Sequence, residues 1–183
     1  MLAGLSVVLA SAADPAYESA KRKLEAIQED RARPGSRVWL SLAELNAYGR
    51  QAALTVAPQG LRSPRLELGN GAAAGSALID FLKVRELKGP APNPLVAWFL
   101  SGERPVRAEA RIESGGGRAT VYLQKVTVSW ATAQGAALDF LVQNFLLPFY
   151  PEAAINKPFD LKHNVDRFEI SPAGVNVVIA PKR

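Results

Sequence analysis

The sequence predicts an α+β fold in which a curved, mostly antiparallel sheet of hairpins wraps short helices. Segments with alternating apolar residues occur in pairs, and a turn containing glycine joins each pair, at residues 69–71, 115–117 and 172–174. Such turns connect neighbouring antiparallel strands. Between the pairs lie short segments with the apolar spacing of helices. Helices that alternate with hairpins predict an α+β domain.

The composition is that of a globular protein. The 183 residues, 48% hydrophobic and 21% charged, suit one domain with a sizeable core. The net charge of +5 permits contact with anionic surfaces such as a membrane, but Lys and Arg are spread along the chain, which favours a solvated surface. With no cysteine, disulfides and thiolate sites are excluded, and a single histidine, His163, excludes a His-rich metal site.

The first residues, MLAGLSVVLASAADP, are typical of a secretory signal. An apolar run at 2–9 precedes Ala-Ser-Ala at 10–12, which fits a cleavage site with small residues, although no positive charge precedes the run. A short buried N-terminal helix is the alternative. The expected organisation is a signal segment at 1–12, an N-terminal helix at 13–35 and a single domain at 36–183, in a periplasmic or secreted protein.

The N-terminal helix is expected to be amphipathic over residues 14–33. One face would carry Tyr17, Ala20, Leu24 and Ile27. A strand at 37–40 follows. Ser41 and Glu44 then form a capping box, which predicts the start of a second helix over 41–54.

The strand at 72–79 is built mainly from Ala, Gly and Ser, which leave space above a sheet. We expect Ala73, Gly75 and Ala77 to face inward, because Ile79 ends that set. Alternation alone does not decide this, and the other set could face inward instead, namely Ala72, Ala74, Ser76 and Leu78.

The clearest hairpin pairs residues 105–113 with 118–130. Glu109 and Glu113 would lie on its outward face. In the return strand the apolar parity switches, which predicts a bulge near Gln124 and Lys125. The apolar positions expected to face inward are Ala119, Val121 and Leu123 before the switch and Val126, Val128 and Trp130 after it.

Two segments, at 94–102 and 136–150, are predicted to be helices with unusually wide apolar surfaces. Such a helix is either packed within the core or closes one side of an apolar groove. For a groove, the residues expected to contact the ligand are Leu95, Trp98, Phe99, Leu138, Leu141, Val142, Phe145, Leu146 and Phe149 on the helices and Ala73, Gly75 and Ala77 on the strand.

No motif indicates catalysis. The chain has no Gly-x-Ser-x-Gly elbow and no phosphate-binding glycine loop, and its His, Asp and Glu residues show no metal-ligand spacing. Arg104, Arg107, Arg111 and Arg118 cluster around one hairpin, but glutamates interrupt them, so a solvated face is favoured over nucleic-acid binding. We therefore expect no enzymatic activity, no metal, no cofactor and no nucleic-acid partner.

The order of elements, with Ser-x-x-Glu-Leu-Asn at residues 41–46, resembles the tubular lipid-binding superfamily, nearest its bacterial mannan-elongation-factor-like proteins and related small lipoproteins. The resemblance covers about residues 36–180. It implies a curved sheet around a long helix, an apolar groove and no catalysis. The chain departs from the lipoproteins by lacking a lipobox cysteine. The expected function is binding of a lipid, or of another acyl or polyprenyl chain. The alternative is an envelope structural or interaction protein without a small ligand.

Overall fold

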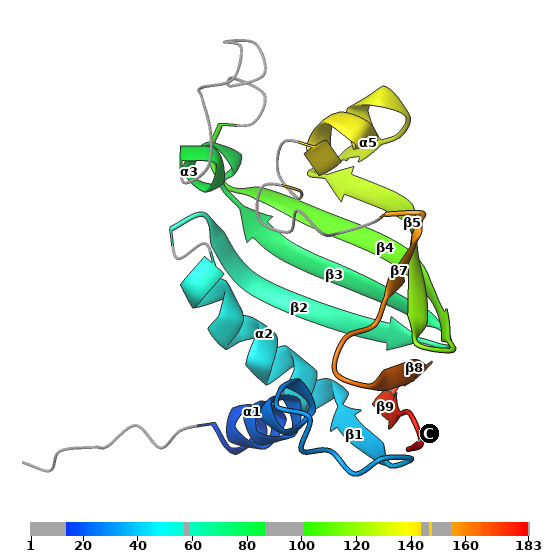
Figure 1. Cartoon of the computed structure of the whole chain (residues 1–183). Helices are drawn as coiled ribbons and strands as arrows, with labels where there is room; N and C mark the ends of the chain where they lie inside the picture. The colour runs from blue at the N-terminus through cyan, green and yellow to red at the C-terminus, as the bar shows by residue number, and fades with distance from the viewer. Residues whose placement is uncertain (1–13, 57–58, 87–100, 144–146, 148–154, 183) are drawn as a thin grey trace, which may run out of the picture.

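The computed structural model describes residues 14–56, 59–86, 101–143, 147 and 155–182. Within them the protein is α+β, as predicted, with four helices and nine strands whose ladders are all antiparallel (Figure 1). The elements are, in order, α1 (Pro15–Gln28), β1 (Arg37–Ser41), α2 (Leu42–Val56), β2 (Leu61–Gly69), β3 (Ala72–Ile79), α3 (Phe81–Glu86), β4 (Arg104–Gly115), β5 (Arg118–Val128), β6 (Ala131–Ala133), α5 (Ala136–Leu141), β7 (Pro158–Asp160), β8 (Val165–Ser171) and β9 (Gly174–Ile179).

The strands divide between two sheets, whereas the sequence predicts one. The larger sheet has the order β2-β3-β4-β5-β6, with β7 paired to β5, and the smaller has the order β1-β9-β8. Backbone hydrogen bonds still join them. The Gly71 N–H donates to the Ile170 carbonyl at 3.2 Å, and the Gly117 N–H donates to the Asp166 carbonyl at 2.9 Å. Strand β8 therefore contacts the turns of both the β2–β3 and the β4–β5 hairpins.

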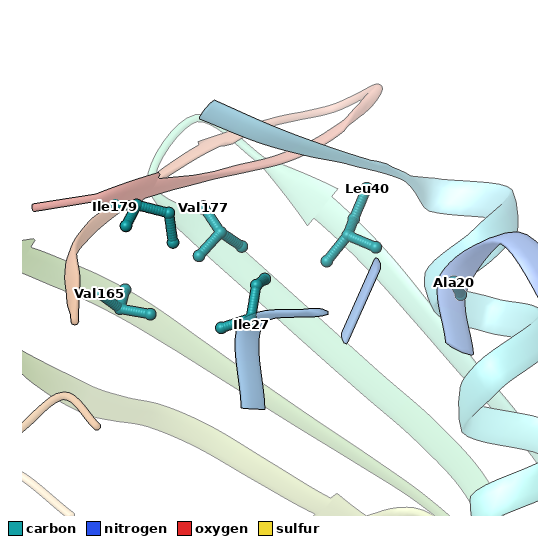
Figure 2. Packing of buried hydrophobic residues seen from close by; sticks show 6 residues of the cluster. All are labelled: Ala20, Ile27, Leu40, Val165, Val177 and Ile179. Carbon is teal, nitrogen blue, oxygen red and sulfur yellow. The ribbon is translucent and has the colours of Figure 1, made fainter. Parts of the chain in front are cut away.

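The smaller sheet packs against α1 and α2 around one hydrophobic core. Figure 2 shows side chains from α1, β1, β8 and β9 pointing toward one another. The buried members are Ala20, Ile27, Leu40, Val165, Val177 and Ile179. Helix α1 ends at Gln28, before the predicted residue 33, and Asp30 lies in the left-handed region at φ 53°. Few residues other than Gly, Asn and Asp adopt that conformation readily, and it interrupts a helix.

The predicted capping box at the start of α2 is present. The Ser41 N–H donates to Glu44 Oε2 at 2.7 Å, and the Glu44 N–H donates to Ser41 Oγ at 3.2 Å. The same carboxylate accepts hydrogen bonds from Ser19 Oγ at 2.5 Å and Lys23 Nζ at 2.6 Å, both on α1. Glu44 is only 7% exposed, so it joins the two helices at a buried point.

Asn46 attaches α2 to the larger sheet. Its Oδ1 accepts from the Leu66 N–H at 2.7 Å, and its Nδ2 donates to the Leu66 carbonyl at 2.9 Å. Because β2 is an outer strand, this amide takes the place of a strand partner and covers part of an exposed edge. Glu44 and Asn46, two polar residues of the motif behind the family resemblance, thus hold neighbouring elements together.

The predicted bulge in β5 is confirmed. Glu109 pairs with Lys125 while Ala110 pairs with Leu123, which leaves Gln124 as the extra residue. The prediction for Trp130 is wrong: this side chain is 85% exposed. Strand β5 ends at Val128, and Ser129, at φ 56°, turns the chain toward β6, so the alternation does not continue to Trp130.

Candidate functional site

One face of the larger sheet bears an apolar cavity of about 390 Å³. Its floor comes from β3, β4 and β5, and its walls from α3, α5 and the chain around β7. Figure 1 shows both α3 and α5 above the larger sheet in this view. Among the described residues, every side chain that lines the cavity is a hydrocarbon: Ile79, Phe81, Val106, Ala108, Val121, Leu123, Val126, Val128, Leu138, Leu141, Val142, Ile155 and Phe159. The cavity is therefore suited to an apolar ligand.

The bulge in β5 produces the continuous floor. Side chains alternate between the two faces of a regular strand, so Leu123 and Val126, three positions apart, would point in opposite directions. The additional residue, Gln124, restores the parity, and both side chains line the cavity.

The role of Phe81 is not anticipated by the sequence analysis, which places no helix after β3. Phe81 is 4% exposed and opens α3. The residue before it caps this helix, since the Lys83 N–H donates to Asp80 Oδ1 at 3.2 Å. Asp at an N-cap, followed by apolar residues at 81 and 84, is the signal that could have revealed the helix.

Three of the predicted helix residues do line the cavity. These are Leu138, Leu141 and Val142. Regular helix ends at Leu141, and the Leu147 N–H then donates to the Val142 carbonyl at 2.9 Å, a wider turn than an α-helix makes. The other predicted helix residues lie outside the described residues: Leu95, Trp98, Phe99, Phe145, Leu146 and Phe149.

The register of β3 settles which of its two faces points toward the cavity. Gly75 pairs with Ala108 and Ala77 with Val106, and both partners line the cavity. Directly paired residues share a sheet face, so the odd set faces the cavity side as expected. Ala73, Gly75 and Ala77 do not line the cavity itself; they continue its floor onto β3. A Cβ atom added at Gly75 would meet no atom of the described residues within 4 Å, so these residues leave the space above Gly75 open.

The opposite face of the sheet is charged. Arg107 pairs with Glu67 at 2.8 Å and with Glu109 at 2.9 Å, while Arg111 pairs with Glu113 at 2.7 Å. The hydrogen bond from Arg107 lowers the pKa of Glu67. The outward orientation predicted for Glu109 and Glu113 is thus confirmed.

A second, more polar hollow of about 700 Å³ surrounds His163, at the junction of β8 and the segment after α1. Asn164 donates to Asp30 Oδ1 there at 3.2 Å. In the described part of the chain, no group of three His, Cys, Asp or Glu side chains could hold a metal ion.

Comparisons with family models, curated proteins and solved structures found no match for this chain. Among the residues that the structure describes, no helix is long and apolar enough to cross a membrane.

Proposed function

We propose that the protein is exported and binds a lipid, or another ligand with a long apolar chain, in the cavity above β4 and β5, without catalysing a reaction. The observation that carries this proposal is the hydrocarbon lining, to which all thirteen of the described lining residues contribute. The volume of about 390 Å³ lies within the roughly 300–1,000 Å³ of typical small-molecule sites. Each buried methylene contributes about 0.8 kcal/mol, so a long chain can bind without specific polar contacts.

The proposed ligand extends beyond the cavity along a strip of small residues on β3, which consists of Ala73, Gly75 and Ala77. The open space above Gly75 supports this extension. A β-bulge bends its strand, so we also propose that the sheet curves around the ligand at Gln124. A curved sheet with an apolar groove is what the resemblance to the tubular lipid-binding superfamily implies.

Export is proposed from the apolar run and the Ala-Ser-Ala segment near the N-terminus. The net charge of +5 is compatible with peripheral contact with an anionic membrane from which a lipid could be taken.

The test of the function is a titration with an environment-sensitive fatty-acid probe, together with native mass spectrometry of protein purified from cells. We expect probe binding at micromolar concentrations, displacement by phospholipid, and a co-purified mass in the lipid range. A well-folded protein that binds neither probe nor phospholipid would overturn the proposal and favour an envelope structural protein.

Replacing Ala77 with Leu tests the strip on β3. If the ligand lies there, the larger side chain occupies its space, and probe affinity falls while the urea midpoint stays the same or rises slightly. If the strip is instead packed in the native state, the same change overpacks it at about 1–3 kcal/mol. Urea melts and probe titrations of one preparation separate the two outcomes. A lower urea midpoint, with probe binding lost only as the protein unfolds, would contradict the proposal that the ligand lies along this strip.

A further inference from the structure

Arg104 lies at the edge of the apolar cavity. It is the first residue of β4 and pairs with Ile79, which lines the cavity. Alternation along β4 places it on the same face as Val106 and Ala108, and opposite to Arg107 and Arg111. The cavity side of the sheet thus carries a positive charge beside an otherwise hydrocarbon surface.

One donor of the Arg104 guanidinium has no partner among the described residues, although the residue as a whole is only half-buried. Its Nε is buried and makes no hydrogen bond. Two neighbouring carboxylates are already engaged, since Glu103 pairs with Arg62 at 3.2 Å and Asp80 pairs with Lys83 at 3.5 Å. A buried donor without an acceptor destabilises the fold, and more so when the donor is charged. Buried polar groups in folded proteins nearly always have a partner, so a ligand is a direct explanation for this one.

We propose that Arg104 binds the anionic head of the amphiphile whose chain occupies the cavity. The inference rests on the proposed function and narrows its ligand to amphiphiles with a carboxylate or phosphate head. A guanidinium presents parallel N–H donors that match both groups in bidentate fashion. The chain supplies affinity through the hydrocarbon lining, and Arg104 fixes which end of the ligand lies at the edge of the cavity.

The test compares three probes with the same sixteen-carbon chain: hexadecanoate, hexadecyl phosphate and hexadecanol. In the full chain, Arg104→Gln should weaken binding of one or both anions by about tenfold or more, the loss of a charge-assisted hydrogen bond, and leave hexadecanol within about twofold. Arg104→Lys should restore part of the loss. The anion that is affected identifies the head group as carboxylate, phosphate or both. Arg111→Gln, which removes the same charge from the opposite face, should change none of the three affinities.

A stability measurement separates ligand binding from a structural role. The thermal midpoint of ligand-free Arg104→Gln should equal or exceed that of the wild type, because the variant removes the buried Nε donor that has no acceptor in the described part of the chain. The proposal would be overturned if Arg104→Gln weakened all three probes equally or left the binding of both anions unchanged. It would also be overturned if Arg111→Gln weakened anion binding as much as Arg104→Gln does. None of these results would contradict the apolar site itself. Failure of all three probes to bind the wild type would overturn the proposed function itself.

Discussion

Replacing Leu141 with Asp is expected to abolish binding of the fatty-acid probe, with an affinity loss of at least about 100-fold. Leu141 is the last residue of α5 and lines the cavity without being fully buried. A carboxylate at this position would have to lose its hydration when a hydrocarbon chain enters. The unbound protein keeps this position in contact with water, so it should remain folded.

The matched control for this variant is Leu54→Asp. Leu54 lies on α2, is not among the described residues that line the cavity, and is 59% exposed. Probe titrations and far-UV circular dichroism of both variants should show full binding for Leu54→Asp and none for folded Leu141→Asp. Wild-type affinity in Leu141→Asp would mean that the probe does not enter the cavity.

The second large effect is expected from Glu44→Gln, which should destabilise the protein by about 3 kcal/mol at pH 7. Burial alone would raise the pKa of Glu44, but hydrogen bonds from Lys23, Ser19 and Ser41 lower it from 4.5 to about 2. A folded-state pKa below the unfolded value means that the carboxylate stabilises the fold above pH 4.5. That stabilisation is lost as the pH falls from about 4.5 toward 2.

Urea melts at several pH values measure this effect. The difference between wild type and Glu44→Gln should be largest near neutral pH and shrink toward zero near pH 2. Glu113→Gln serves as the control, since Glu113 lies on the outward face in an exposed ion pair, and it should change stability by less than about 1 kcal/mol. A Glu44→Gln effect as small as that of the control, or one independent of pH, would show that Glu44 does not link α1 to α2.

Local patterns predict the local structure well. The capping box and the bulge each follow from a few consecutive residues, because the hydrogen bonds and side-chain alternation that define them are short-range. Assembly of the strands does not follow in this way. Strand β1 pairs with β9, joining Arg37 to Val178, and alternating patterns do not specify which distant strand will be the partner. The division into two sheets therefore becomes visible only in the structure.

The candidate site was predictable only in part. Leu138, Leu141 and Val142 are predictable because a wide apolar surface on a helix is visible within one segment of the sequence. Phe159 and Ile155 come from short, irregular stretches without a periodic pattern, and only the fold brings them to the cavity. The sequence groups Arg104 with the arginines of a solvated hairpin face, whereas β4 begins at Arg104, and alternation along this strand places the residue on the cavity face.

The central claim is that a hydrocarbon chain occupies the cavity between the larger sheet and α5. Crystals grown with hexadecanoic acid that carries bromine at the end of its chain would locate that chain directly by anomalous scattering. The account predicts a bromine peak among Val106, Leu123, Val126 and Leu138. A peak only on the charged outer face beside Arg107, or no bound bromine at a saturating concentration of the acid, would contradict it.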